Sequence, residues 1–228
     1  MAMATEPAPS LADLLAVYAV TPDGFDPDLH QARLEAAFAA GLRCLQLRDK
    51  AASPEQLCRL AERWRAITAA HGALLFINDQ ADLADAVGAD GVHLGPSDEP
   101  LPAVRARHPH LLLGGSASSP DRALLLAGQG ADYLGIGAIF DASATKPDAR
   151  HHRGPDLLRQ LRLIPELAQL PLVAIGGITL DNASACFHAG ADGVAAVRAL
   201  LGAPDPAAAV TTLLRLRYES GGTSSSAR

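Results

Sequence analysis

Short apolar runs alternate with longer amphipathic stretches along almost the whole chain. The short runs are rich in Val, Ile, Leu and Tyr, and the longer stretches carry Ala, Leu and Arg at helical spacing. Alternation of strand and helix is typical of a parallel sheet in an α/β protein. The eight predicted strands are Leu15–Thr21, Cys44–Arg48, Leu74–Asn78, Gly91–Leu94, Leu111–Gly115, Tyr133–Ile139, Leu172–Gly176 and Gly193–Val197.

Eight strands, each followed by a helix, favour a closed barrel over an open doubly wound sheet. The predicted fold is therefore α/β, a single (β/α)8 TIM barrel over residues 9–218. The 228 residues suit a compact barrel that buries roughly three-quarters of the unfolded surface in one core. Residues 1–8 and 219–228 are small, polar and unpatterned, so we expect disordered ends that flank the barrel.

A weak internal repeat supports this fold. Gly-Ala-Asp begins at Gly88, Gly130 and Gly190, and each time a predicted strand starts within three residues. The glycine is typical of a left-handed residue that ends a helix. These segments are predicted to be turns on the bottom face of the barrel, where residues serve stability and not chemistry.

The other ends of the predicted strands carry polar side chains, which a closed barrel brings together at one mouth. Gln46, Arg48 and Lys50 alternate along the second strand, so we expect them to project to the same side. Two cations and an amide suit a diphosphate, because Arg can bind phosphate oxygens in pairs and Lys adds a mobile point charge.

Carboxylates follow the next two strands. Asn78 and Asp79 end the third strand and Asp98 follows the fourth, without the His or Cys partners that zinc prefers. Hard oxygen ligands of this kind indicate Mg²⁺, which commonly completes its shell with water and substrate phosphates. The sequence therefore predicts a magnesium site opposite the cations.

Glycines follow the seventh strand, where barrels commonly bind phosphate through backbone N–H groups. Gly176 and Gly177 would let a phosphate approach the main chain closely, and Arg198 after the eighth strand would add a charged contact. The stretch 140–154 is long for this fold and rich in hydroxyls and cations, which is typical of a binding loop. His93 lies within a strand and is expected to be a hydrogen-bonded barrel residue.

Composition narrows the function classes. A net charge of −6 without a long run of Lys or Arg excludes a nucleic-acid-binding surface. Cys44, Cys58 and Cys186 are widely spaced and odd in number, which argues against disulfides or structural zinc and indicates a cytoplasmic protein. No apolar run reaches the length of a membrane span, and the N-terminus lacks the pattern of a signal peptide.

Taken in order, these motifs resemble the thiamine phosphate synthase family over about residues 15–201. The matching segments are Gln46–Lys50, Ile77–Asp79, Ala86–Gly95 with Asp98, Gly114–Ser116, Asp132–Phe140, Thr145–Lys146 and Ala174–Ile178. The resemblance implies a transferase that joins 4-amino-5-hydroxymethyl-2-methylpyrimidine diphosphate to 4-methyl-5-(2-phosphooxyethyl)thiazole or its carboxylate. The products would be thiamine phosphate and pyrophosphate.

The resemblance also implies roles for individual residues. Those that would bind the pyrimidine diphosphate are Gln46, Arg48, Lys50, Asn78, Ser116 and Lys146. Of these, Arg48, Lys50 and Lys146 would be catalytic, because their charge stabilises the leaving pyrophosphate. Asp79 and Asp98 would hold Mg²⁺. Those that would lie at the thiazole phosphate are Ser143, Ala144, Thr145, Gly177, Val197 and Arg198.

The chain also departs from the family pattern. The segment Phe140–Lys146 is one residue longer than usual, and Arg198 stands where the family tends to have Ser. Related thiazole tautomerases use a His where this chain has Ser118, so a tautomerase would lack its acid–base residue. Two alternatives stay open, a tautomerase-like isomerase and a non-catalytic binder of thiamine intermediates. The expected partners are phosphorylated small molecules, and the sequence is compatible with a homo-oligomer.

Overall fold

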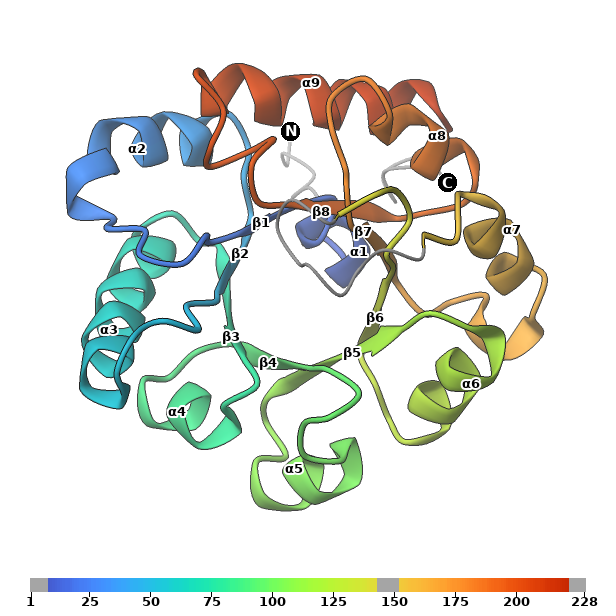
Figure 1. The fold of residues 1–228 in the computed structure, drawn as a ribbon, viewed down its shortest axis with the longest axis horizontal. Helices are drawn as coiled ribbons and strands as arrows, with labels where there is room; N and C mark the ends of the chain where they lie inside the picture. The colour runs from blue at the N-terminus through green and yellow to red at the C-terminus, as the bar shows by residue number, and fades with distance from the viewer. Residues whose placement is uncertain (1–7, 143–151, 222–228) are drawn as a thin grey trace, which may run out of the picture.

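The computed structural model describes residues 8–142 and 152–221. Eight parallel strands close into a barrel in the order β1 to β8 (Figure 1), which confirms the predicted (β/α)8 fold. The strands are β1 Val17–Val20, β2 Cys44–Leu47, β3 Leu74–Asn78, β4 Gly91–Leu94, β5 Leu112–Ala117, β6 Tyr133–Ile136, β7 Leu172–Ile175 and β8 Gly193–Ala196.

Helices surround the strands, and α9 lies beside α2 and α8 on one side of the barrel (Figure 1). Within the described residues the α-helices are α1 Leu11–Leu14, α2 Gln31–Ala39, α3 Pro54–Ala70, α4 Ala81–Ala86, α5 Leu101–Arg107, α6 Pro120–Gly128, α7 Asp156–Arg162, α8 Ala183–His188 and α9 Pro206–Glu219. Two short 3₁₀ helices, Asp28–His30 and Pro165–Leu167, precede α2 and β7. None of the helices in residues 8–142 and 152–221 is long and apolar enough to cross a bilayer.

The core has two apolar layers. The larger one lies between strands and helices and is built mainly from Leu, Ala and Val, as the composition led us to expect. The smaller one fills the barrel interior around Tyr18, Phe76 and Tyr133. Leu11 of α1 packs against this interior layer, and an ion pair between Asp13 and Arg217 at 3.0 Å ties α1 to α9. The short first helix therefore closes one end of the barrel.

The repeated Gly-Ala-Asp segments form turns that join a helix to the next strand. Gly88, Gly130 and Gly190 have φ values of +65°, +84° and +99°, which confirms their predicted left-handed conformation. L-residues with a Cβ adopt this region at a cost, so glycine suits the position. Each turn delivers the chain from a helix end directly into β4, β6 or β8.

The aspartate of each repeat fastens two neighbouring strands. Asp132 Oδ2 accepts hydrogen bonds from the Leu113 N–H at 2.7 Å and from Arg105 Nη2 at 2.6 Å. The equivalent bonds join Asp90 to Leu75 N and Arg65, and Asp192 to Leu172 N and Arg162. We call these three arrangements the Arg–Asp clamps. They occupy the N-terminal ends of the strands, where residues were predicted to serve stability.

Some strands end at other residues than predicted, and one difference affects the candidate site. β2 ends at Leu47, so Arg48 and Lys50 lie in the following loop. The expectation that Gln46, Arg48 and Lys50 alternate along one strand is therefore wrong. β5 extends to Ala117 and includes Ser116, while α9 continues through Glu219.

Candidate active site at the C-terminal ends of the strands

Two loops at the mouth are joined through Asp23, which follows β1. Asp23 Oδ1 accepts hydrogen bonds from Arg48 Nη1 and from the Lys50 N–H, each at 3.0 Å. Thr21 Oγ1 also accepts from the Arg48 N–H at 2.9 Å and donates to the Arg48 carbonyl at 2.8 Å. These bonds fix the backbone of Arg48, and its side chain remains 27% exposed at the mouth.

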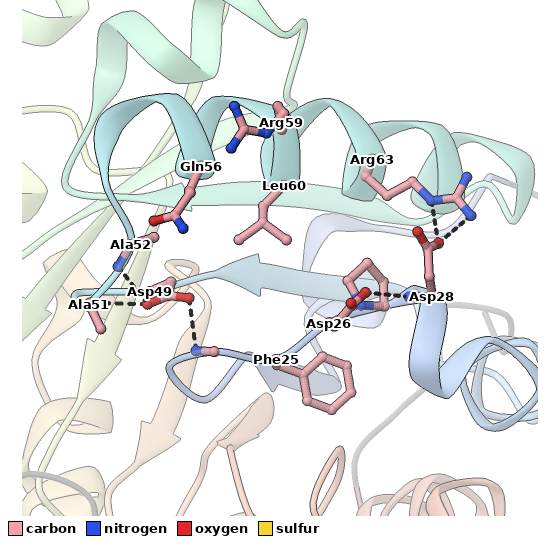
Figure 2. A pocket seen from close by; sticks show the side chains of 12 residues that line it. Phe25, Asp26, Asp28, Asp49, Ala51, Ala52, Gln56, Arg59, Leu60 and Arg63 are labelled. Atoms are coloured by element: carbon pink, nitrogen blue, oxygen red, sulfur yellow. Dashed lines mark hydrogen bonds and ion pairs between the residues drawn. The ribbon is translucent and has the colours of Figure 1, made fainter.

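Asp49 secures the same two loops from the other side. Its Oδ2 accepts from the Gly24 N–H at 2.8 Å, and its Oδ1 accepts from the Ala51 and Ala52 N–H groups (Figure 2). Gly24, Ala51 and Ala52 border a cavity of about 590 Å³ between this region and α3, which Arg59 also lines. Among the described residues, none of those predicted to bind substrate or metal lines this cavity.

Gln46 turns into the barrel and not toward the loop cations. Its side chain is 5% exposed, and Nε2 donates to the Tyr18 hydroxyl at 2.8 Å. Strand alternation explains this orientation, because successive side chains of β2 face opposite sides of the sheet. Gln46 therefore belongs to the floor of the mouth, while Arg48 and Lys50 belong to its rim.

The two predicted metal-binding carboxylates are brought together, and a cation lies beside them. Lys50 Nζ is 3.4 Å from Asp79 Oδ2, and Asp98 lies near enough to Asp79 for each carboxyl to shift the pKa of the other. Burial and the neighbouring Asp98 raise the pKa of Asp79, against the opposing effect of Lys50. Burial also disfavours the charged form of Asp98, but bonds from Asp79 and the Gly95 N–H outweigh it and lower the pKa of Asp98. The two carboxyls therefore differ in acidity, and Asp79 is the one that keeps its proton to higher pH.

The backbone of Asp79 is unusual. Its φ is +64°, and no other non-glycine among the described residues has a positive φ. Its N–H donates to the His93 carbonyl at 3.0 Å, which links the end of β3 to β4. Gln80, not Asp79, is the N-cap of α4, so helix capping does not account for the carboxylate. A strained backbone that directs a carboxylate into a polar mouth is typical of a functional position.

A cavity of about 250 Å³ lies at the ends of β2 and β3. Lys50, Asn78 and Asp79 line it, together with Leu47 and Gln80. Three of the residues predicted for the diphosphate and the metal thus border one space. Its polar lining and its position at the strand ends match the expected location of the chemistry.

Ser116 lies inside the mouth and contacts a buried histidine. Its Oγ is 2.8 Å from His93 Nε2, while His93 Nδ1 is 2.8 Å from the Tyr133 hydroxyl. Both ring nitrogens have partners, which confirms the expectation of a hydrogen-bonded barrel histidine. Burial lowers the pKa of His93 to about 4, so the ring is neutral at pH 7.

The glycines after β7 make close contact with another loop. Gly176 and Gly177 have φ values of +97° and +65°. A Cβ on Gly177 would lie 2.4 Å from the Asp141 carbonyl oxygen, and a Cβ on Gly176 would lie 2.6 Å from the Ala138 Cβ. Because both positions lack a Cβ, the backbone segment that follows β6 can pass close to them. Their approach to a phosphate stays a prediction.

Two further residues predicted for the thiazole phosphate, Val197 and Arg198, directly follow β8. Val197 is partly buried and Arg198 is exposed directly after β8, and Arg198 has no ion pair within residues 8–142 and 152–221. The predicted residues Ser143, Ala144, Thr145 and Lys146 lie outside the described residues.

Sequence reasoning missed several residues that organise the mouth. Asp23 and Thr21 orient Arg48, and their signal was available, because Thr-Pro-Asp-Gly follows the first strand directly. Tyr18 and Tyr133 were assigned only to strands, although their hydroxyls bond to each other at 2.9 Å inside the barrel. A Tyr in a barrel strand carries no signal of its own, since its ring alone explains the position.

The chain is similar to known proteins over most of its length. The family model described as thiamine monophosphate synthase matches residues 17–200. A thiamine-phosphate synthase of Chloroflexus aurantiacus is 43% identical over 201 residues, covering 88% of this chain and 91% of the relative. A thiamine biosynthesis bifunctional protein of Symbiobacterium thermophilum is 41% identical over 208 residues, but the match covers 91% of this chain and only 42% of that larger protein.

A solved structure shows the same architecture. The thiamine phosphate pyrophosphorylase of Pyrococcus furiosus superposes with a TM-score of 0.80 at 34% identity, covering 92% of this chain and 99% of that one. The superposition therefore covers nearly the whole of both chains. The chain therefore belongs to the thiamine monophosphate synthase family.

Proposed function

We propose that the chain joins 4-amino-5-hydroxymethyl-2-methylpyrimidine diphosphate to a thiazole phosphate, forming thiamine phosphate and pyrophosphate. The observation that carries this proposal is the group formed by Lys50, Asp79 and Asp98, which lies at the ends of β2, β3 and β4. A cation beside a carboxylate pair is what a diphosphate with a bound divalent metal requires. Family membership supports the same reaction.

The reaction needs charge stabilisation more than it needs a nucleophile. The bond between the pyrimidine methylene carbon and the diphosphate oxygen breaks, and its electron pair leaves with pyrophosphate. The ring nitrogen of the thiazole then supplies the pair that forms the new C–N bond. Arg48 and Lys50 would stabilise the negative charge that develops on the leaving group. Lys146 would add a third cation.

The carboxylates that now neutralise these cations would not prevent diphosphate binding. Arg48 is paired with Asp23 and Lys50 with Asp79, and the side chains are 27% to 59% exposed. Ion pairs of this exposure contribute only about 0–1 kcal/mol. A diphosphate carries more charge than either carboxylate, so it would displace them readily while the pairs keep both cations near their working positions.

The donor set fits Mg²⁺. Asp79 and Asp98 offer hard oxygens, and a divalent cation would compete with the proton that the raised pKa of Asp79 favours. When bound, Mg²⁺ would neutralise charge on the diphosphate. No group of three or more His, Cys, Asp or Glu side chains placed to hold a metal occurs in the described part of the chain, so a phosphate would have to complete the shell.

Magnesium binding has a readout independent of activity. Calorimetric titration with MgCl₂ and pyrophosphate in buffers of different ionisation enthalpy should show release of a proton, and affinity should rise with pH as Asp79 loses its proton. Asp79→Asn should abolish the proton release. The matched control is Asp181→Asn, an exposed carboxylate after β7, which should behave as wild type. Unchanged proton release in Asp79→Asn would remove the metal assignment.

The direct test is synthesis. Purified protein incubated with both substrates and MgCl₂ should form thiamine phosphate and an equal amount of pyrophosphate. Absence of product, where a known synthase reacts, would overturn the proposed function. Binding of thiamine phosphate without turnover would support the non-catalytic alternative. Isomerisation of the thiazole carboxylate phosphate that persists in Asp79→Asn would support a tautomerase, although Ser118 provides no imidazole.

We also propose that the substrates meet the enzyme in the cytoplasm. Cys44, Cys58 and Cys186 are all free thiols, which suits a reducing compartment. The proposed domain spans residues 9–218, and a homo-oligomer is compatible with the exposed apolar side chains Leu29 and Leu163. Sedimentation of the purified protein would determine its oligomeric state.

A further inference from the structure

A chain of hydrogen bonds crosses the barrel interior and joins two residues of the mouth. It runs from Gln46 Nε2 to the Tyr18 hydroxyl at 2.8 Å, and on to the Tyr133 hydroxyl at 2.9 Å. From there it continues to His93 Nδ1 at 2.8 Å, and from His93 Nε2 to Ser116 Oγ at 2.8 Å. Its two end residues, Gln46 and Ser116, are both assigned to the pyrimidine substrate under the proposed function. The three residues between them have no role in that proposal.

Glycines on neighbouring strands make room for the rings of this chain. Gly114 of β5 is the register partner of Tyr133, and a Cβ there would lie 2.2 Å from the tyrosine Cζ. A Cβ on Gly135 of β6 would lie 2.9 Å from His93 Cε1. The barrel therefore holds both rings in one position, because each occupies the volume that a neighbouring side chain would fill.

In one direction of donation, the hydrogens of Tyr18, Tyr133 and His93 all meet an oxygen or nitrogen acceptor. The Gln46 amide donates to Tyr18, so the Tyr18 hydroxyl donates to Tyr133 and the Tyr133 hydroxyl donates to His93 Nδ1. Nδ1 is then the acceptor of the ring, and Nε2 carries the hydrogen that it donates to Ser116. The Ser116 hydroxyl hydrogen remains to be donated to another group.

The opposite direction is less favourable. If His93 Nδ1 donated to Tyr133, then Tyr133 would donate to Tyr18, which already accepts from Gln46. The Tyr18 hydrogen would then have to turn to the thiol of Cys44, its other neighbour. Both directions keep the four bonds of the network, but sulfur is a weak acceptor, so the second leaves the hydrogen of the buried Tyr18 hydroxyl poorly bonded.

We propose that Tyr18, Tyr133 and His93 are positioning residues that present Ser116 as a hydrogen-bond donor and the Gln46 carboxamide oxygen as an acceptor to the pyrimidine substrate. The inference rests on the proposed function and adds specificity to it. A 4-aminopyrimidine offers an amino group that donates and a ring nitrogen that accepts. A 4-oxopyrimidine offers the reverse pattern, an oxygen that accepts and a ring N–H that donates. The hydrogen-bond network from Gln46 to Ser116 would therefore select the 4-aminopyrimidine over the 4-oxopyrimidine.

The test compares the 4-amino and 4-oxo pyrimidine diphosphates as substrates. Wild type should prefer the amino compound in kcat/KM by about a hundredfold, because the oxo compound leaves buried polar groups unpaired. Tyr133→Phe removes one hydroxyl and keeps the ring, so His93 loses the partner that fixes its tautomer. The preference should then fall about tenfold, which is the effect of one hydrogen bond to a buried group.

A spectroscopic measurement reports on the direction of the hydrogen-bond network and does not depend on catalysis. The ¹⁵N shifts of the His93 ring should show hydrogen on Nε2 in wild type and a mixture of tautomers in Tyr133→Phe. Phe76→Leu is the matched control, since Phe76 packs against both tyrosine rings, at centroid distances of 5.7 and 5.2 Å, but offers no polar atom. That control should lower stability and leave both the tautomer and the substrate preference unchanged.

The outcomes separate this inference from the proposed function. An Nδ1–H tautomer in wild type, or an unchanged preference in Tyr133→Phe, would overturn the inference while thiamine phosphate synthesis stands. If wild type forms no thiamine phosphate, the proposed function is wrong, and the His93 tautomer still decides the direction of the chain. If Tyr133→Phe fails to fold, Tyr18→Phe breaks the chain one link earlier and should reduce the same preference.

Discussion

Both ends of the barrel contain basic side chains paired with Asp, but the two ends use these pairs differently. At the base, one arrangement occurs three times, and each aspartate of the Arg–Asp clamps also holds the N–H of a strand residue. At the mouth no pair resembles another: Asp23 holds Arg48, whereas Asp79 holds both Lys50 and a second carboxylate. We infer that the repeated Arg–Asp clamps maintain the fold, whereas the ion pairs at the mouth, which differ from one another, are available for chemistry.

The largest difference in kcat is expected between two variants, each of which lacks one arginine from one end of the barrel. Arg48→Ala is expected to lower kcat about a hundredfold or more, because one charge that stabilises the leaving group is lost. Its effect on stability should stay below about 1 kcal/mol, as for other partly exposed ion pairs. Arg105→Ala, at the base, should leave kcat unchanged. Steady-state kinetics and urea unfolding of both variants measure this contrast, and equal losses of activity would show that it is wrong.

Removing an aspartate at the base should affect stability alone. Asp132→Ala leaves the Leu113 N–H and the Arg105 guanidinium without their partner, which should lower the free energy of unfolding by about 2–3 kcal/mol. Turnover per folded molecule should equal that of wild type, since the residue is at the end opposite the mouth. Denaturant unfolding and an active-site titration test this. A selective loss of turnover would mean that base and mouth are coupled.

In the barrel interior, between the two ends, we expect a smaller effect, a dependence of the free energy of unfolding on pH. Burial raises the pKa of the Cys186 thiol to about 12 and raises the pKa of Cys44, Tyr18 and Tyr133 as well. The unfolded thiol loses its proton above its ordinary pKa of 9, whereas the native thiol keeps it until about pH 12. Stability is therefore complete below pH 9 and is lost as pH rises from 9 to 12.

For Cys186 alone this loss amounts to about 1–2 kcal/mol at pH 10. Denaturant unfolding at pH 8, 9 and 10 should show the decrease, and Cys186→Ala should flatten it. If the slope is the same in wild type and Cys186→Ala, the thiol does not ionise on unfolding in this range.

The smallest effect is expected on the surface, away from both ends. Arg215 and Glu219 form an exposed i,i+4 pair on α9, with side chains 62% and 51% exposed. Arg215→Ala should change the free energy of unfolding by less than about 0.5 kcal/mol and leave kcat unaltered. Urea unfolding of wild type and Arg215→Ala measures the change in the free energy of unfolding. A loss as large as that of Asp132→Ala would show that pairing itself, and not attachment to a strand N–H, stabilises the base.

The sequence predicts the fold well because local patterns determine it. Apolar runs and the glycines at 88, 130 and 190 indicate where strands begin, and each pattern lies within a few residues. The clamps carry a signal that was overlooked, since arginine and aspartate recur 25, 27 and 30 residues apart. A search for this second spacing would have identified them.

The mouth is harder to predict because its contacts join loops that are distant in sequence. That Asp79, Asp98 and Lys50 share one region follows from the barrel, but the partner of Arg48 depends on how the loop after β1 turns. The glycines after β7 illustrate the same difficulty. Their positive φ fitted a phosphate site, yet the space beside them admits another loop of the chain. Sequence indicates which residues meet, and only the fold shows what lies between them.

The left-handed backbone at Asp79 has a consequence for how this protein can change. Holding a non-glycine residue in that conformation costs on the order of 1 kcal/mol, which glycine would avoid. Screening for thermal stability alone should therefore favour Asp79→Gly, the substitution that removes a carboxylate from the proposed metal site. At this position, selection for a more stable barrel and selection for a working enzyme oppose each other.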